Sequence, residues 1–272
     1  MLLIFISLGG VFGMITSLQN ESVKEYKLLC KKGKEGLIPL EGTRLICDAI
    51  HSGVSFEDFF ITEELLSSQS GREIKGLLSE KGIEYVLISN KVAEGISLTK
   101  TSQGVFASAK WKPENEGYLM SSEVRTIVAL DGVSDPGNVG TLIRTSAAMG
   151  VDAVLFGGKS AKGTNPKAIR ASMGTIFKVP CVESSNLAET LKRLKNEGFQ
   201  IISADASGTP VDILKCNIPF VLVIGGEAFG ITESIREITS DFVSIPMKEK
   251  VESLNASVAG GILIYDIMRR FG

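Results

Sequence analysis

The sequence has few of the side chains on which many enzymes depend. Its 272 residues include one histidine, His51, and four cysteines that lie far apart: Cys30, Cys47, Cys181 and Cys216. A single histidine disfavours a histidine-based metal site and a Ser-His-Asp triad, and the cysteines have no CxxC or other metal-ligand spacing. Cysteines scattered in this way also indicate a reduced, cytoplasmic compartment.

The chain also has little net charge. Its 29 lysines and arginines against 31 aspartates and glutamates give a formal charge of −2, so no field of the whole protein attracts a nucleic acid. The one basic cluster, five lysines within residues 24–34, is interleaved with glutamates, as on a solvated helix face. Charge therefore neither supports nor excludes an RNA partner.

Positive charge is missing from the N-terminal stretch. Residues 1–18 are mostly apolar, and the first lysine or arginine is Lys24, so the stretch lacks the basic region of a secretory signal. Glycines interrupt the run, which is too short for a membrane span, and we expect no membrane partner. Because Met14 begins a more ordinary sequence, we expect residues 1–13 to be a mis-assigned start or a loosely attached extension.

What the sequence does have is a β-α pattern in two parts. Residues 14–111 alternate short apolar strands with helices, which indicates a small α/β domain with strands at 59–62, 85–89 and 104–109. A polar stretch that contains Pro113 and Gly117 predicts a linker over residues 112–122.

Residues 123–272 have stronger β-rich runs. Strands are expected at 126–130, 153–156, 200–203 and 220–224, and helices at 139–149, 187–196 and 257–270. Continuous apolar runs of this kind are typical of strands covered on both faces. The sequence therefore predicts an α/β fold whose second domain is a mostly parallel sheet with helices on both sides.

A first motif follows the strand at 126–130. Asp135-Pro136-Gly137 predicts a tight turn, and Asn138 stands where a helix N-cap is expected, with Arg144 further along the same helix. Alone, the pattern is also compatible with an ordinary capped helix that carries an exposed cation.

A second motif, Gly225-Gly226-Glu227-Ala228-Phe229-Gly230, follows the strand at 220–224. Its glycines allow close approach of the backbone or positive φ angles. An unpaired carboxylate at such a strand end is costly, so we expect Glu227 to pair with an arginine. A glycine-rich turn with a solvated glutamate is the alternative, and no Lys-Ser/Thr follows to make a phosphate-binding P-loop.

A third motif joins Ile245-Pro246-Met247 to a C-terminal helix that begins after Ser253 and Asn255, both possible caps. Gly260 and Gly261 lie inside that helix, where each costs about 1 kcal/mol relative to alanine. Another backbone that approaches closely would explain them, either from a second subunit or from packing within one chain.

Together and in this order, the three motifs resemble those of the SpoU/TrmH-type RNA ribose 2'-O-methyltransferases of the SPOUT superfamily. The resemblance implies a trefoil-knotted catalytic domain over residues 123–272. It also implies an RNA substrate-binding domain over residues 14–111, related to a ribosomal-protein fold. Further implications are S-adenosylmethionine as cofactor, ribosomal RNA (23S favoured) as substrate, and a homodimer formed through the C-terminal domain.

The resemblance also assigns site residues. It implies Arg144 as the catalytic residue, supported by Asn138, Glu227, Ser253 and Asn255. The cofactor would be held by Ser203, Ala204, Gly225, Gly226, Ile245, Met247 and Leu254, with no metal. Methyl transfer to a ribose hydroxyl needs in-line alignment, and a guanidinium favours the forming alkoxide electrostatically. We expect Glu227 to orient Arg144.

Three alternatives remain at this stage. The substrate is a transfer RNA instead, or the protein is a non-catalytic RNA-binding or ribosome-assembly factor on the same fold, or it is an α/β enzyme of another class. A Rossmann dinucleotide site is disfavoured because no GxGxxG joins a strand to a helix.

Overall fold

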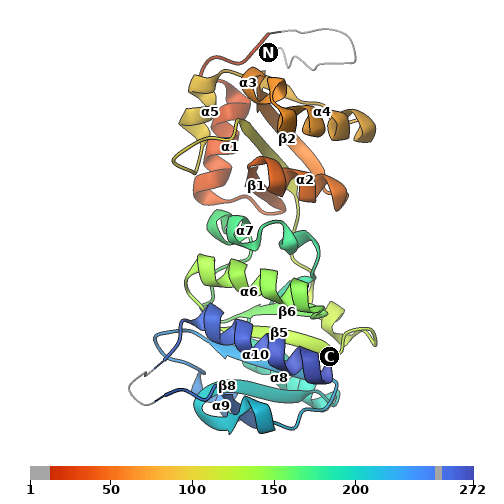
Figure 1. The fold of residues 1–272 in the computed structure, drawn as a ribbon, viewed down its shortest axis with the longest axis vertical. Coiled ribbons are helices and arrows are strands. Elements are labelled where there is room, and N and C mark those ends of the chain that lie inside the picture. Colours follow the sequence, from red (N-terminus) through yellow and green to blue (C-terminus); the bar gives the residue numbers. More distant parts are fainter. Residues whose placement is uncertain (1–12, 249–252) are drawn as a thin grey trace. The chain divides into compact units, whose positions relative to one another are not determined.

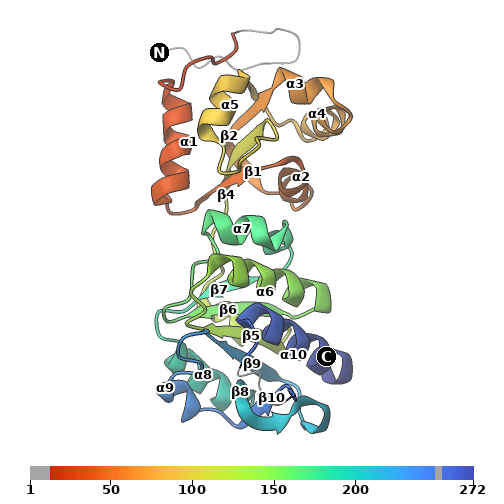
Figure 2. The same cartoon turned by 60° about the vertical axis from the view of Figure 1, so that its left-hand side comes forward.

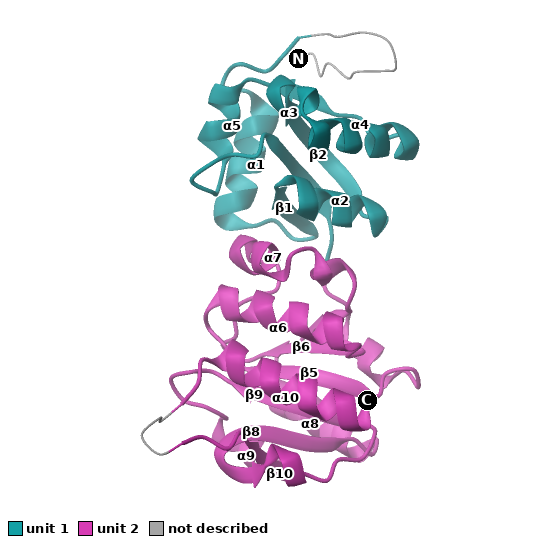
Figure 3. Ribbon diagram, in the orientation of Figure 1, with its two compact units in different colours: residues 1–112 teal, residues 113–272 magenta. Residues whose placement is uncertain are grey.

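The computed structural model describes residues 13–248 and 253–272. The chain divides into two compact units, residues 1–112 and 113–272 (Figure 3). All but the last residue of the expected leader, 1–13, lies outside the described residues. No helix in the described part of the chain is long and apolar enough to cross a membrane.

Unit 1 is a three-layer α/β structure. Its four-stranded sheet has the order β1-β4-β2-β3, in which β4 runs antiparallel to both neighbours and β3 pairs parallel with β2. Helices α1 and α5 cover one face, and α2 and α4 the other (Figure 2). The elements are α1 (Glu21–Lys32), β1 (Leu37–Glu41), α2 (Thr43–His51), β2 (Ser55–Thr62), α3 (Glu63–Ser67), α4 (Gln69–Lys81), β3 (Val86–Ile88), α5 (Asn90–Ile96) and β4 (Val105–Lys110).

An aromatic cluster holds α1 on the sheet of unit 1. The Tyr26 ring meets Phe60 of β2 and Phe106 of β4 edge-on, with centroid distances of 6.1 and 5.8 Å. The Tyr26 hydroxyl donates to the carbonyl oxygen of Leu40 at 3.0 Å, so the buried ring leaves this polar group satisfied.

Unit 2 is built on a six-stranded sheet in the order β10-β8-β9-β5-β6-β7, and every pair is parallel. Its strands are β5 (Thr126–Asp131), β6 (Ala153–Gly157), β7 (Cys181–Glu183), β8 (Gln200–Pro210), β9 (Phe220–Gly225) and β10 (Asp241–Ser244). All six residues of β5 are buried. The predicted α/β fold with a parallel sheet is confirmed.

Helices cover both faces of this sheet (Figure 1). Helix α6 (Pro136–Met149) and α10 (Ala256–Phe271) lie side by side on one face, and α7 (Pro166–Ser172) packs on α6. Helices α8 (Leu187–Asn196) and α9 (Glu233–Arg236) cover the other face, where their leucines and isoleucines join those of the central strands in one buried cluster.

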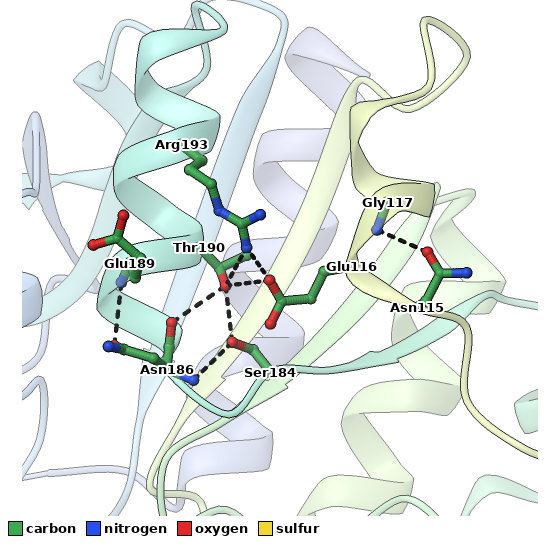
Figure 4. A network of polar contacts seen from close by, with 8 residues as sticks. All are labelled: Asn115, Glu116, Gly117, Ser184, Asn186, Glu189, Thr190 and Arg193. Carbon is green, nitrogen blue, oxygen red and sulfur yellow. Dashed lines mark hydrogen bonds and ion pairs between the residues drawn. The ribbon is translucent and has the colours of Figure 1, made fainter.

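The expected linker, residues 112–122, is instead largely part of unit 2. Glu114 donates its backbone N–H to the carbonyl of Cys181 at 2.7 Å, beside β7, and a 3-10 helix follows at Glu116–Met120. Leu119 in that turn is fully buried. The Glu116 carboxylate pairs with Arg193 of α8 and accepts from the Thr190 hydroxyl at 3.0 Å (Figure 4).

Several elements differ from the sequence-based expectation. Helix α6 begins at Pro136 with Asp135 as its N-cap residue, so the prediction that Asn138 caps it is wrong. Strand β8 continues to residue 210, past the expected end at 203, and pairs with β10 after a register shift. Strands β1, β7 and β10 and helix α7 were not expected.

Candidate active site

The first two motifs meet where the strand order reverses. The chain places β6 and β7 on one side of β5, and β9, β8 and β10 on the other. At such a switch point, the loops that leave the carboxyl ends of neighbouring strands diverge and leave room for a ligand. The motif after β5 and the motif after β9 therefore lie next to each other.

Close backbone contact fixes these two loops. Gly226 donates its N–H to the carbonyl of Asp131 at 2.9 Å, and a Cβ on Gly226 would overlap the carbonyl oxygen of Gly132. The Asp131 carboxylate, 3% exposed, accepts from the backbone N–H of Thr232 at 2.7 Å. Sequence reasoning missed Asp131, although a carboxylate that ends an apolar strand was a usable signal.

Glu227 is bound by an amide and not by an arginine. Asn138, 9% exposed, donates from its side-chain nitrogen to the Glu227 carboxylate. The Arg144 side chain is exposed and makes no hydrogen bond or ion pair with any described residue, so the expected Arg144–Glu227 pair is absent from the described part of the chain. Six residues along a helix turn the side chain by about 240° and advance it by about 9 Å, which points Arg144 away from Asn138.

A cavity opens beside Glu227, at the ends of β8, β9 and β10. Helix α10 also lines it, through Ala256, Ala259 and Leu263. Six of the residues expected to hold the cofactor line it: Ala204, Gly225, Gly226, Ile245, Met247 and Leu254. Glu227 and Ser253 line it as well.

Two other residues that were expected in the site, Ser203 and Asn255, make structural contacts instead. Ser203 is fully buried, and its hydroxyl lies 2.7 Å from that of Thr239, so it does not line the cavity. Asn255 caps α10 by accepting from the N–H groups of Ser257 at 3.0 Å and Val258 at 3.3 Å. The interpretation of Asn255 as a helix cap therefore describes its contacts in this chain.

The cavity is acidic. Asp205 and Glu227 line it, and no described lining residue is a lysine or arginine. Hydrogen bonds from Ser207, together with the pairing to Arg236, hold the pKa of the Asp205 carboxyl below its usual value. Arg236 also lies over the Phe242 ring, 5.2 Å from its centroid. The Asn138 amide that binds Glu227 is neutral, so Glu227 is the carboxylate that gives the cavity its charge.

The loop after β6 is attached to the other side of the first motif. The Ser160 hydroxyl donates to the carbonyl of Leu130 at 2.9 Å and accepts from the N–H of Val133 at 3.1 Å. Further on, a Cβ at Gly140 would overlap the carbonyl of Ala168, so the glycine lets α7 pack directly on α6. The loop and α7 are thus both packed directly against the segment that carries the first motif.

Two family models match the two units. The model of the SpoU rRNA Methylase family matches residues 125–265, and that of the MRM3-like substrate binding domain matches residues 20–107. The 23S rRNA (guanosine(2553)-2'-O)-methyltransferase RlmP of Bacillus subtilis is 32% identical over 93% of this chain and 98% of its own length. An uncharacterized tRNA/rRNA methyltransferase of Synechocystis is 28% identical over 94% and 93%.

Solved structures share the fold along nearly the whole chain. The AdoMet-bound rRNA methyltransferase of Sinorhizobium meliloti superposes with a TM-score of 0.83, at 24% identity, over 95% of this chain and 98% of that one. The SpoU methyltransferase AviRb of Streptomyces viridochromogenes, in complex with AdoMet, gives 0.80 at 24% identity, over 92% and 98%. The chain therefore belongs to the SpoU rRNA methylase family, whose members are S-adenosylmethionine-dependent RNA methyltransferases.

Proposed function

We propose that this protein transfers a methyl group from S-adenosylmethionine to the 2'-hydroxyl of a ribose in 23S ribosomal RNA. The observation that carries the proposal is the carboxylate of Glu227, which Asn138 of the first motif binds beside a cavity lined by residues of the second and third motifs. The similarity to RlmP, which is named for 23S ribosomal RNA and matches from end to end, supports the choice of substrate.

The cavity suits that cofactor. S-adenosylmethionine supplies an electrophilic methyl group on a positively charged sulfur. The Glu227 carboxylate, in a cavity that no described lysine or arginine lines, favours such a charge. Small residues (Gly225, Gly226, Ala256) leave backbone groups within reach of an adenosine, and Ile245 and Leu254 offer apolar contact for its base.

The residues of the first motif would act on the ribose. Asn138 fixes Glu227, which then orients the acceptor or a cation near it. Arg144 remains protonated at neutral pH, so its role is to favour the forming alkoxide or to bind a phosphate that relays the proton. Arg144 does not line the cavity of its own chain, and a further element is therefore needed to bring it to the reaction.

We propose that this element is a second copy of the chain. Helix α10 exposes an apolar face at helical spacing: Val258 is 50% exposed, Ile262 41% and Tyr265 55%. A Cβ at Gly261, on the same face, would meet nothing within 4 Å, whereas one at Gly260 would overlap Leu142 of α6. Pairing through this face would cover it and would bring Arg144, on the adjacent α6, toward the partner's cavity.

Two measurements test whether the protein is a dimer and whether Arg144 acts in the site of the partner subunit. Light scattering should give about twice the chain mass of 29.1 kDa. Mixing Arg144→Ala protein with Glu227→Ala protein should restore activity if the two residues act across the interface, because one of the two sites is then intact. No recovery in a proven mixed dimer would place both residues in one chain's site, and a monomer would reject the dimer.

The proposed reaction is tested in two steps. Calorimetry should show that the wild type and Arg144→Ala bind S-adenosylmethionine alike, because Arg144 is assigned to the chemistry. The wild type should then methylate an unmodified 23S ribosomal RNA transcript at one ribose, located by mass spectrometry, and Arg144→Ala should not. No cofactor binding by the wild type would reject the enzyme and favour a non-catalytic RNA-binding protein. Methylation of a transfer RNA transcript alone would reject only the substrate.

The compartment is also a proposal. All four cysteines lie in the described part of the chain, and none forms a disulfide. Reduced thiols are what the cytoplasm maintains, which is where an enzyme that acts on bacterial-type ribosomal RNA would work.

A further inference from the structure

Positive charge is concentrated in one segment of unit 2. Residues 153–182 contain four lysines and one arginine and no aspartate or glutamate, in a chain whose formal charge is −2. Four of these cations lie close together in sequence, in the loop after β6 and in α7, and we call them the basic segment: Lys159, Lys162, Lys167 and Arg170.

The basic segment lies at the same edge of the sheet as the cofactor cavity. At that edge the strands follow in the order β10, β8, β9, β5, β6. The cavity occupies the ends of the first three, the first motif follows β5, and the basic segment follows β6. The first motif therefore lies between the cavity and the basic segment.

Most charges of the basic segment are open to solvent. Lys159 and Lys162 are exposed, Arg170 is half-buried, and none of the three side chains makes a hydrogen bond or ion pair with a described residue. Lys167 lies 2.5 Å from the Asp135 carboxylate, and both side chains are about half exposed. Such a surface pair is worth about 1 kcal/mol or less, so a phosphate can compete for Lys167.

The segment is also held in place. Ser160 binds the backbone on both sides of residue 131, and Ala161 donates its N–H to the carbonyl of Val133 at 2.9 Å. Gly140 admits α7, with Lys167 and Arg170, against α6. The backbone that carries the cations is thus fixed relative to Asn138.

We propose that the basic segment binds the phosphate backbone of the substrate RNA next to the methylated nucleotide. The inference rests on the proposed function. A ribose presented to the first motif carries a phosphate on each side, and the Glu227 carboxylate on the cavity side would repel them. The basic segment, on the opposite side, offers the complementary charge. Such contacts fix the position of the RNA and do not read its sequence.

The test compares two double variants with the same loss of charge. Lys159→Ala/Lys162→Ala removes two exposed cations of the basic segment. Lys192→Ala/Lys215→Ala removes two exposed lysines elsewhere, one on α8 and one before β9. Binding of an unmodified 23S ribosomal RNA transcript is measured by filter binding over a series of KCl concentrations. Thermal unfolding and calorimetry with S-adenosylmethionine accompany each variant.

For the basic-segment variant we expect RNA affinity to fall about tenfold at 0.1 M salt, and the slope of log affinity against log salt to decrease by about 1.5. Its melting temperature and cofactor affinity should match the control. RNA affinity and salt slope equal to those of the control would overturn the inference. So would unchanged RNA binding combined with loss of binding to poly-glutamate, which would assign the segment to an acidic protein.

The outcome is separable from that of the proposed function. RNA binding is measured without turnover, so the comparison stands even if no methyl group is transferred. Conversely, a protein that methylates the transcript while the basic-segment variant binds RNA normally would keep its proposed function and lose this inference.

Discussion

Each unit holds a glutamate at the end of a strand, and the two are used differently. Glu41 ends β1 in unit 1 and is 7% exposed. Its carboxylate accepts from the hydroxyls of Ser97 and Thr99, the latter at 3.0 Å, and from the N–H of Leu98 at 2.7 Å. Glu227 follows β9 in unit 2, is exposed, and its carboxylate accepts one hydrogen bond from the described residues, that of Asn138.

The difference separates a structural carboxylate from one available to a ligand. A carboxylate has about four acceptor positions. At Glu41, the domain fills most of them and thereby fixes the segment 97–99. At Glu227, one donor sets the orientation and the remaining positions face a cavity. The four predictions below test this contrast and a second contrast between the units.

The largest expected effect is on catalysis in unit 2. Glu227→Ala should lower single-turnover methylation on the order of 100- to 1000-fold, as expected for the loss of a preorganised polar group, and should change cofactor affinity much less. Asn138→Ala should have a comparable effect, because the two residues act as a pair. Unchanged turnover in Glu227→Ala would contradict the assignment.

Glu41→Ala should cost stability and not chemistry. It removes three hydrogen bonds to a buried carboxylate, and we expect unit 1 to lose about 3 kcal/mol. Amide exchange read along β1 localises the effect in the full-length chain. Glu57→Ala is the control, because Glu57 makes an exposed pair with Lys34 at 3.4 Å, worth less than about 1 kcal/mol. Equal losses of stability in the two variants would show that the hydrogen bonds of Glu41 do not stabilise unit 1 more than an exposed ion pair does.

Gly226→Ala should disturb the contact between the two loops. The added methyl group overlaps the Gly132 carbonyl, so we expect a loss of about 2 kcal/mol in stability. Calorimetry should also show weaker cofactor binding. Gly76→Ala, in α4 of unit 1, has open space around the new methyl group and should stabilise by about 1 kcal/mol. If Gly226→Ala changed neither stability nor cofactor affinity, the close contact between the two loops would not be required.

The smallest effect concerns acid stability and has opposite signs in the two units. Hydrogen bonds from Ser207 lower the pKa of Asp205, so its charge stabilises the fold at neutral pH and that contribution is lost as the pH falls through the carboxyl range. Burial raises the pKa of Asp58 in unit 1, so its charge destabilises the fold at neutral pH and acid relieves this.

Urea unfolding of Asp205→Asn and Asp58→Asn measures that contrast. At pH 7 the first variant should be less stable than the wild type and the second more stable, each by less than about 1 kcal/mol because solvent screens both groups. Both differences should vanish below the carboxyl pKa values. Shifts of the same sign would contradict the pKa directions.

The sequence predicted the central strands and helices of unit 2 because their signals are local and long. β5 and α8 lie within one residue of the expected ranges. β7 has three residues and β10 four, too few for a periodic signal, and β8 continues through polar residues because β10 pairs with it. The sequence also contains a start signal for helix α7, because Asn165 is an N-cap residue directly before Pro166.

The site was predictable as a set of motifs but not as a set of contacts. Glycines 225 and 226 indicated close approach: Gly226 meets the loop after β5 at Gly132, and Gly225 meets Gly230 of its own turn. The partner of Glu227 depends on which side chain of α6 faces the edge of the sheet. Where the helix begins decides which side chain that is. Placing the start three residues too late made Asn138 a cap and left Arg144 as the expected partner of Glu227.

The cavity is completed by α10, whose residues are the last of its lining to be synthesised. A chain leaves the ribosome from its N-terminus and folds domain by domain. Unit 1 can therefore form while the wall made by Ala256, Ala259 and Leu263 is still inside the exit tunnel. A nascent chain would therefore complete the domain that matches the substrate-binding model before it completes the cavity of unit 2.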